Sequence, residues 1–451
     1  MTPHSLQCIS GWGNAPREQC QIYRPNTPDS IRETLDNGIA STWIPRGLGR
    51  SYGDPAINGN AGVIALDRTN CMISFDSRSG ILEAEAGVSL AEIIDAFLPR
   101  GWFLPVTPGT KFVTLGGAIA NDIHGKNHHV DGSFSRYVMD FTLLTPNGSV
   151  LNCSRDLNAD VFWATVGGIG LTGIILTVRM QLLKVESAYI RTDYRRCPNV
   201  EVLLQAIAET DQAYRYSVAW VDCLATGAYL GRSVLMSGDH VRAADMPHDA
   251  DPFYVKPKPK KSVPFEFPEM ALNPWSIGAF NEIFYMRHPT AYDTIVDYDT
   301  YFYPLDSIHS WNRIYGRRGF TQYQATVPDG EEQGIVTLLE RLSESGRASF
   351  LAVLKRMGPA GPGLLSHPIS GYTLTLDIPM RDGLVPFLHE LDEILLKHRG
   401  RLYLAKDVCT RPETFAAMYP RLDEFRAIKA RLDPQNRISS RMARRLKIVP
   451  A

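Results

Sequence analysis

Three glycine-rich segments in the N-terminal part of the chain have the composition of phosphate-binding loops. They read PRGLGRSYGD at 45–54, TPGTKFVTLGGAIANDIHGKNHH at 107–129 and VGGIGLTGI at 166–174. Because glycine has no Cβ, backbone N–H groups in such loops approach phosphate oxygens closely, and successive N–H groups form an anion-binding concavity. Two such loops in one unit predict a binding site for a diphosphate.

The third segment also matches the dinucleotide fingerprint G-x-G-x-x-G, from Gly168 to Gly173. The residues that follow, ILTV, are strand-like, and no strand–helix–strand unit surrounds them, whereas the fingerprint requires a helix at that point. We therefore interpret these glycines as a tight turn into a strand, which still allows close contact with a bound cofactor.

Local patterns predict an α+β unit around these loops. A helix is expected between the N-cap Thr27 and Gly38, with Pro28 at its first position, and a second helix from Ser89 to before Gly101. Strands are expected at 43–47, 62–67, 81–87 and 175–183, and Pro146-Asn147-Gly148 predicts a hairpin between FTLLT and SVLNC. The first unit is expected to end near residue 187.

A second α+β domain with a substantial sheet is predicted from residue 200 onward. Helical segments such as EVLLQAIAETDQA alternate there with strand-like runs such as YRYSVAWVD, TQYQATV, SFLAVLK and YTLTLDIP. The stretch 248–275 is rich in proline and contains the cluster KPKPKK, which predicts an extended, mobile loop. This loop either simply extends into solvent or forms a lid that contacts lipid headgroups.

Composition sets further limits. The 451 residues carry a formal net charge of −1 and are 44% hydrophobic, which excludes a disordered chain and gives no overall field for nucleic acid. Seven scattered cysteines without a C-x-x-C pair indicate reduced thiols. The pattern predicts neither a cleaved signal nor a membrane span, and hence a cytoplasmic location.

Taken together and in order, the motifs carry a family resemblance. RGLGRSYGD, PGTKFVTLGGAIANDIHGKNHH and FWATVGGIGLTGII resemble the flavin domain of the vanillyl-alcohol-oxidase superfamily. With WNRIYG at 311–316, QYQ at 322–324, LYLAKD at 402–407 and MARRL at 442–446, the whole chain resembles the decaprenylphosphoryl-β-D-ribose 2′-oxidase family.

The resemblance implies an FAD-binding domain in two parts, 1–187 and 401–451, with an α+β substrate domain at 188–400 that contains an antiparallel sheet. Arg50 stands where covalent members of the superfamily often carry histidine, so we expect non-covalent FAD. The residues implied to contact the cofactor are Pro45, Arg46, Gly47, Leu48, Gly49, Arg50, Ser51, Tyr52, Gly53, Asp54, Gly109, Thr114, Leu115, Gly116, Gly117, Asn121, Asp122, Ile123, His124, Ile175 and Tyr403.

The reaction implied is oxidation of the 2′-hydroxyl of a polyprenylphosphoryl ribose to a 2′-keto sugar, after which an NAD(P)H-dependent short-chain reductase completes epimerisation to the arabinose form. Lys406, His124 and Tyr52 are the expected catalytic residues. Lys406 would act either as the base or as the group that stabilises the negative charge of the reduced flavin. The structural alternative is that Lys406 only forms a salt bridge with Asp407. The lipid substrate adds an expectation of peripheral contact with the inner membrane.

The expected substrate-binding residues are Lys126, Tyr315, Gln322, Gln324, Lys355, Thr373 and Thr375. Lysine suits a phosphate and glutamine suits hydroxyl groups, although Tyr315 and the glutamines could equally be structural. Mycobacterial members of the family carry cysteine at the position of Thr375 and asparagine at that of Thr373. This chain is therefore expected to lack the thiol that nitroaromatic inhibitors modify.

Three alternatives remain open. An alditol or aldonolactone oxidase could use the same flavin scaffold, and a non-catalytic protein could merely bind polyprenyl phosphate or a partner. A metal site is a further possibility, suggested by the cluster of His124, His128 and His129. Paired histidine ligands would need a helix at this point, and Gly125 and the β-like flanks argue against one. We therefore expect no metal.

Overall fold

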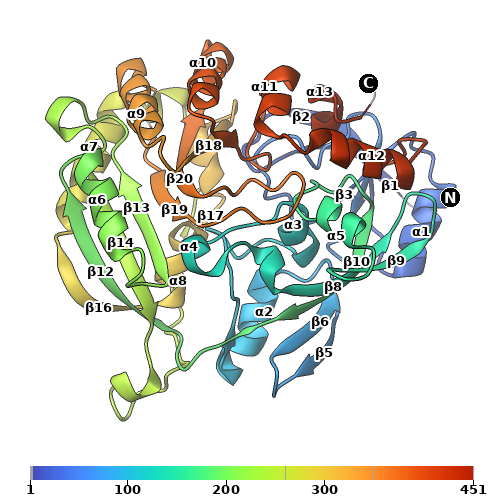
Figure 1. Cartoon of the computed structure of the whole chain (residues 1–451), viewed down its shortest axis with the longest axis horizontal. Helices are drawn as coiled ribbons and strands as arrows, with labels where there is room; N and C mark the ends of the chain where they lie inside the picture. The colour runs from blue at the N-terminus through green and yellow to red at the C-terminus, as the bar shows by residue number, and fades with distance from the viewer. Residues whose placement is uncertain (1–3, 260, 348, 450–451) are drawn as a thin grey trace.

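The computed structural model describes residues 4–259, 261–347 and 349–449. Two sheets of mainly N-terminal strands form one half of the molecule, and a large sheet forms the other half (Figure 1). The α+β class expected from the sequence is confirmed. Among the described residues, no helix is long and apolar enough to cross a membrane.

The N-terminal half contains a four-stranded and a five-stranded sheet. The first has the order β1 (His4–Ser10), β2 (Arg17–Tyr23), β4 (Gly62–Ala65), β3 (Trp43–Arg46). The second has the order β5 (Met72–Asp76), β6 (Ile81–Glu85), β10 (Ile174–Gln181), β8 (Val138–Leu144), β9 (Val150–Ser154). The strands and the hairpin expected in this region are confirmed, including the strand after the third glycine-rich segment.

Helices of this half begin where side chains cap them. Thr27 and Ser30 form a capping box at α1 (Pro28–Asn37), and Ser89 and Glu92 do the same at α2 (Leu90–Phe97), which confirms both predicted helices. Thr114 caps the short α3 (Leu115–Ala120). The remaining helices of this half are α4 (His128–Asp131) and α5 (Ala159–Thr165).

The large sheet has eight strands. Their order is β16 (Ala291–Asp297), β12 (Tyr189–Cys197), β14 (Ser233–His240), β13 (Tyr216–Val221), β19 (Ala352–Met357), β20 (Gly371–Pro379), β18 (Phe320–Pro328), β21 (Arg401–Leu402). Each neighbouring pair is antiparallel. The predicted substantial sheet is confirmed. β21 lies just beyond the expected domain boundary at residue 400, and that boundary stays a prediction.

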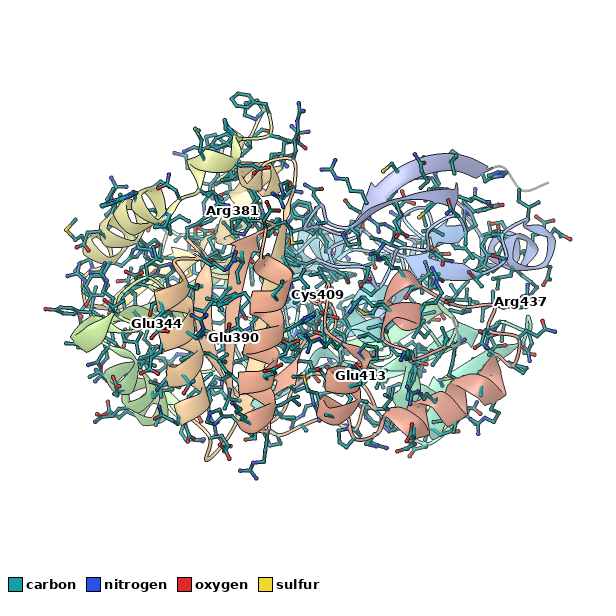
Figure 2. All side chains as sticks on the ribbon, turned by 90° about the horizontal axis from the view of Figure 1, so that it is seen from above. Glu344, Arg381, Glu390, Cys409, Glu413 and Arg437 are labelled. Carbon is teal, nitrogen blue, oxygen red and sulfur yellow. The ribbon has the colours of Figure 1, made fainter. Side chains whose placement is uncertain are left out.

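Helices cover one face of this sheet. α9 (Gln333–Ser345) and α10 (Leu384–Lys397) lie side by side over it (Figure 2), and α6 (Val200–Thr210) contacts β12 and β14. β20 is buried along its whole length, as is almost all of β18. Strands with two buried faces can direct polar side chains toward a shielded site on the face away from the helices.

The C-terminal segment returns to the N-terminal half. It contains α11 (Pro412–Met418), α12 (Leu422–Leu432) and α13 (Arg441–Arg445), and both termini lie at the same side of the molecule (Figure 1). Ile438 bridges to Trp43, and Arg437 donates to the carbonyl oxygen of Pro146 at 2.6 Å. These contacts place the end of the chain against β3 and against the hairpin of β8 and β9.

The proline-rich stretch has little regular structure, as its composition predicts. Its described part contains β15 (Lys261–Ser262), paired with β17 (Ile308–His309), and a 3₁₀ turn at Glu269–Ala271. The helix α7 (Pro274–Arg287) begins at its end and is capped by Asn273. Two further short elements complete this region, α8 (Tyr298–Phe302) and a 3₁₀ turn at Trp311–Tyr315. The two-stranded pair β7 (Trp102–Phe103) and β11 (Leu183–Lys184) joins two segments of the N-terminal half.

Candidate functional site

A cavity lies where the three glycine-rich segments meet, and residues of all three line it. Its walls contain the following residues that were expected to hold a cofactor: Pro45, Arg46, Gly47, Leu48, Gly49, Arg50, Ser51, Thr114, Gly116, Gly117, Asn121 and Ile175. The family resemblance therefore predicted a set of residues that the structure brings together at one cavity.

Glycine is required where the first two loops touch. A Cβ on Gly47 would lie 2.2 Å from the Thr114 hydroxyl oxygen, so any larger residue would force the two loops apart. Gly49 has φ +65°, a left-handed conformation that side chains with a Cβ rarely adopt. The loop can thus present its backbone to the cavity while it packs closely against the second segment.

The third glycine-rich segment contributes more than the sequence reasoning assigned to it. Besides Ile175, the wall includes Thr165, Ile169, Gly170 and Gly173, and also Ala56, Leu66 and Ala86 from the first sheets. Ile169 and Gly170 both have positive φ, which produces the tight turn that the sequence predicted. The motif VGGIGLTGI was the signal for these residues.

Several expected cofactor residues lie outside the cavity wall. Gly53 packs against the Asp407 carbonyl, Leu115 and Ile123 are buried in the core, and a Cβ on Gly109 would meet open space. The Asp122 carboxylate accepts hydrogen bonds from Ser133 and Ser366 at 2.9 and 2.7 Å. These residues hold the loops in place from behind, and their contact with a cofactor stays a prediction.

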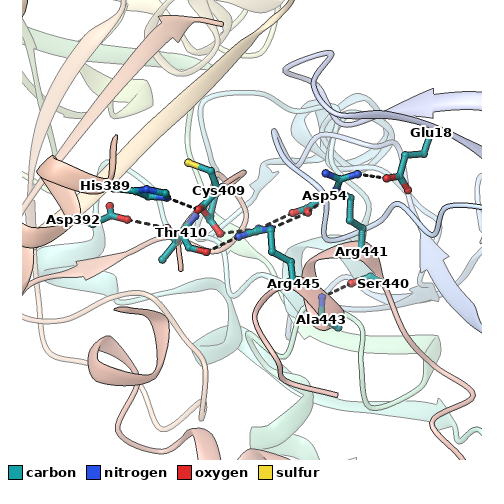
Figure 3. Close-up of polar contacts among 11 residues, drawn as sticks. Glu18, Asp54, His389, Asp392, Cys409, Thr410, Ser440, Arg441, Ala443 and Arg445 are labelled. Carbon is teal, nitrogen blue, oxygen red and sulfur yellow. Dashed lines mark hydrogen bonds and ion pairs between the residues drawn. The ribbon is translucent and has the colours of Figure 1, made fainter. Parts of the chain in front are cut away.

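Asp54 is part of a buried ion-pair network centred on Arg445 (Figure 3). Arg445 contacts the Asp54 carboxylate at 2.8 Å and the Asp407 carboxylate at 2.9 Å, and it donates to the Thr410 carbonyl. Arg445 lowers the pKa of Asp407 despite its burial. The network fastens the first glycine-rich loop to the segment that carries Lys406.

The contacts of Asp407 decide whether this residue forms a salt bridge with Lys406. The proposed salt bridge between Lys406 and Asp407 is wrong, because both carboxylate oxygens of Asp407 are engaged elsewhere, one by Arg445 and the other by the backbone N–H groups of Cys409 and Thr410. The chain turns at this point, since the Lys406 N–H donates to the Tyr403 carbonyl at 2.9 Å, and the Lys406 side chain lies toward Tyr52. Its ammonium group lies 3.9 Å from the centre of the Tyr52 ring.

The cavity has unsatisfied polar atoms that fit FAD. Arg50 Nε and Asn121 Oδ1 are buried in its wall and have no hydrogen-bond partner in the structure. Such atoms normally pair with a ligand or water. Arg50 stacks over Trp12 at 4.0 Å, which fixes the guanidinium group where it can offset the charge of a diphosphate. The residues of this cavity therefore suit the cofactor that the motifs predicted.

One face of the large sheet brings the expected substrate residues together. Gln322 and Gln324 project from β18, opposite Asp377 and Thr375 of β20. Lys355 of β19 lies opposite Thr373. Paired residues of antiparallel strands share a face, and so do residues at i and i+2, so these side chains form one continuous polar group.

Asp377 is the functional candidate that the sequence reasoning missed. Its buried carboxylate accepts a hydrogen bond from Gln322 Nε2 at 2.5 Å and one from the Tyr315 hydroxyl at 3.4 Å. Gln322 Nε2 also lies 3.2 Å from the Tyr52 hydroxyl. The strand GYTLTLDIP gave the signal, because Asp377 is the next same-face position after Thr373 and Thr375.

Burial shifts the pKa values of the two charged residues in this group, Asp377 and Lys406. Burial raises the pKa of Asp377. It lowers the pKa of Lys406, which the Asp377 carboxylate partly raises again and Lys355 lowers further. The two groups therefore titrate as a coupled pair near neutral pH. A lysine that can lose its proton near pH 7 is able to act as a base.

The group adjoins the cofactor cavity through Tyr52 and Tyr403. Tyr52 follows the wall residue Ser51, and its N–H donates to the Ala405 carbonyl at 2.9 Å. The Tyr403 hydroxyl donates to the carbonyl oxygen of the wall residue Asn121 at 2.8 Å. A substrate carbon held beside Lys406 would thus lie next to the cofactor cavity.

A second polar cluster lies around His124. Its Nε2 is 2.9 Å from Gln324 Nε2, while its Nδ1 is buried without a partner. Burial, with Lys355 nearby, lowers the pKa of His124 well below its usual value, so the ring is neutral. Thr373 Oγ1 lies 3.3 Å from Gln324 Nε2, and Thr375 Oγ1 has no partner.

Two half-buried lysines complete this cluster. Burial lowers the pKa of Lys126 to about 7 and that of Lys355 to about 8. Lys126 donates to the Tyr301 carbonyl. Within the described part of the chain, neither lysine takes part in an ion pair. Two half-buried cations without a carboxylate partner are suited to an anion such as a phosphate.

The three histidines of the second segment have separate partners. His128 Nδ1 accepts from the Gly358 N–H at 2.9 Å, and His129 Nε2 lies 3.1 Å from the Tyr214 carbonyl oxygen. The expectation that this stretch is not helical is wrong for His128–Asp131, which forms the one-turn helix α4. Asn127 stabilises this turn through its bond to the Asp131 carboxylate at 2.6 Å.

Comparison with known proteins agrees with this geometry. A family model described as "FAD binding domain" matches residues 21–154, and one described as "D-arabinono-1,4-lactone oxidase" matches residues 377–446. The decaprenylphosphoryl-beta-D-ribose oxidase of Mycolicibacterium smegmatis is 37% identical over 99% of both chains. An uncharacterized protein of Streptomyces coelicolor is 36% identical over 80% of this chain. The L-gulonolactone oxidase of Bos taurus is 32% identical, over 35% of this chain.

The fold and the cavity define an FAD-dependent oxidoreductase, and the predicted cofactor is confirmed by the match to the FAD-binding model. The similarity to the mycobacterial protein extends over nearly the whole length of both chains, whereas the lactone oxidase matches about a third. The chain belongs to the decaprenylphosphoryl-β-D-ribose oxidase family.

Proposed function

We propose that this protein uses non-covalently bound FAD to oxidise the 2′-hydroxyl of a polyprenylphosphoryl-β-D-ribofuranose to the 2′-keto sugar. Family membership supports the substrate class, and one structural observation supports the chemistry. This is the half-buried Lys406, whose ammonium group lies against the Tyr52 ring and whose pKa depends on Asp377, beside the cofactor cavity. FAD, when bound, supplies the acceptor for the hydride that leaves the carbinol carbon.

Lys406 and the side chains around it carry out the proton transfer. Its neutral amine accepts the proton of the 2′-hydroxyl, so the hydroxyl becomes a carbonyl as the C–H hydrogen leaves with its electron pair. The ammonium group that forms is stabilised by the Tyr52 ring and the Asp377 carboxylate. Gln322 and Tyr315 hold that carboxylate in place, so Asp377 is a positioning residue.

The second cluster orients the rest of the sugar phosphate. Lys126 and Lys355 bind the phosphate, because both are half-buried cations outside any described ion pair. Gln324, His124 and the free Thr375 hydroxyl are available for the ribose hydroxyls. The polar groups left unpaired in the structure thus match the polar groups of this substrate.

The 2′-keto product is a reactive intermediate that a second enzyme must consume. We propose an NAD(P)H-dependent short-chain reductase for this step, which would give the polyprenylphosphoryl arabinose. Arg50 in place of a covalent histidine supports dissociable FAD.

Anaerobic titration tests the proposal. Addition of a polyprenylphosphoryl ribose should bleach the flavin absorption of the holoenzyme with one equivalent of substrate, and acid precipitation should release the flavin into the supernatant. Bleaching by aldonolactones or alditols, with no response to the ribose lipid, would support a sugar-lactone oxidase instead. The match of residues 377–446 to the lactone-oxidase model is the observation that favours this second candidate.

A further inference from the structure

The helix α7 has an unusual exposed face. Trp275, Phe280, Ile283 and Met286 have 89, 43, 49 and 57% of their surface exposed. They recur at i, i+5, i+8 and i+11, which places them along one side of the helix. A helix on a protein surface normally directs its charged residues outward, so an apolar outer face marks an interaction site.

The loop before α7 extends this apolar surface. Phe265 and Met270 are 62 and 79% exposed. Figure 2 shows the yellow segment that carries these residues at the margin of the molecule. We call the six exposed side chains of this loop and of α7 the α7 patch; they are Phe265, Met270, Trp275, Phe280, Ile283 and Met286.

Charge around the α7 patch favours an anionic partner. Glu266 and Glu282 are ion-paired with Arg317 and Arg232 at 3.4 and 2.7 Å. Within the described residues 261–287, two exposed cations, Lys261 and Arg287, have no ion pair, and one carboxylate, Glu269, has none either.

Aromatic contacts connect the α7 patch to the candidate site. The Phe280 ring lies 5.7 Å from the Phe350 ring, which lies 5.7 Å from the Tyr315 ring. Tyr315 contacts Asp377 through its hydroxyl group. Arg381 also ties the loop to this region, since it donates to the Glu269 and Leu272 carbonyls. An apolar path therefore leads from the exposed helix to the oxidation site.

We propose that the α7 patch is the surface by which this enzyme docks on an anionic lipid bilayer. The inference rests on the proposed function, because a polyprenyl chain that serves as substrate is itself anchored in the bilayer. Aromatic and aliphatic side chains enter the interface, while Lys261 and Arg287 contact anionic headgroups.

Vesicle binding by the holoenzyme tests this docking surface. The probe is a vesicle of phosphatidylcholine and phosphatidylglycerol with brominated acyl chains, which quench tryptophan fluorescence on insertion. The wild type should bind and lose the emission of Trp275. The variant W275S/I283S/M286S should bind at least about a thousandfold more weakly, because each of the three deleted side chains contributes at least about tenfold. The control variant L6S/I73S/L157S removes side chains that are 67, 51 and 55% exposed elsewhere, and it should bind like the wild type.

Flavin bleaching by a water-soluble, short-prenyl ribose phosphate separates the two proposals. If the α7 variant bleaches like the wild type yet ignores vesicles, docking at this surface is supported. Equal vesicle binding by the α7 variant and the wild type would overturn it, as would a wild type that ignores vesicles. Concentration-dependent dimerisation that the α7 substitutions abolish, without vesicle binding, would assign the surface to a second copy. A protein that binds vesicles through the α7 patch but is never bleached would instead contradict the proposed function alone.

Discussion

Asp377→Asn should shift the pH dependence of catalysis in a direction fixed by the site. In the wild type, kcat/KM should rise through a midpoint near 7, because burial lowers the pKa of Lys406 to about 7 and the neutral amine is the base. The Asp377 carboxylate raises that pKa. Asparagine keeps the shape and removes the charge, so the pKa of Lys406 should fall by about 1–3 units.

The expected result is a rising limb displaced to lower pH by about 1–3 units. The plateau of kcat/KM should fall by up to about tenfold per unit, since each pKa unit corresponds to about 1.36 kcal/mol of stabilisation lost by the ammonium form. Steady-state kinetics with the water-soluble ribose substrate across pH 5–9 measures both quantities. An unmoved midpoint, or one displaced to higher pH, would refute the role of Asp377.

Asp392→Asn is the matched control. Burial raises the pKa of Asp392 to about 7, and its carboxylate accepts from the Tyr323 hydroxyl at 3.1 Å. Tyr323 alternates with Gln322 and Gln324 along β18, so it projects from the opposite face of the sheet. This substitution should leave the midpoint of the pH profile in place.

Three further substitutions or reagents test other parts of the account. Lys406→Arg keeps the positive charge but removes a titratable base, so single-turnover flavin reduction should be abolished although FAD still binds; reduction at the wild-type rate would reassign Lys406 to charge stabilisation. Arg445→Met leaves the buried Asp407 carboxylate without a cation and leaves Asp54 with Arg441 alone, at 3.4 Å, so chemical denaturation should show a loss of about 3–5 kcal/mol, whereas a loss under 1 kcal/mol would count against the network. Turnover with a nitroaromatic inhibitor should give no covalent adduct in intact-mass analysis. Thr375 supplies no thiol, and burial raises the pKa of the Cys223 thiol to about 12. A stoichiometric adduct would contradict this.

Much of the fold was predictable because its signals are local. The two capped helices of the first unit and the hairpin around Pro146-Asn147-Gly148 follow from neighbouring residues alone. α4 was missed because its one turn depends on the Asn127–Asp131 contact and on packing against β19 rather than on apolar periodicity.

The site was only partly predictable, because some of its contacts join residues that are far apart in the sequence. Alternation along β18 and β20 places Gln322, Gln324, Thr373 and Thr375 on one face, and these were expected. The pairing of Arg445 with Asp54 joins residues at opposite ends of the chain, and the coupling of Asp377 to Lys406 depends on burial created by the whole fold. No local pattern specifies such contacts.

The most direct test of the central claim is the visible spectrum of the purified holoenzyme under anaerobic conditions, recorded before and after addition of a polyprenylphosphoryl ribose. The account predicts an FAD spectrum that bleaches stoichiometrically with the ribose lipid and fails to bleach in Lys406→Arg. A flavin that stays oxidised with the ribose lipid, or a Lys406→Arg variant that bleaches like the wild type, would contradict it.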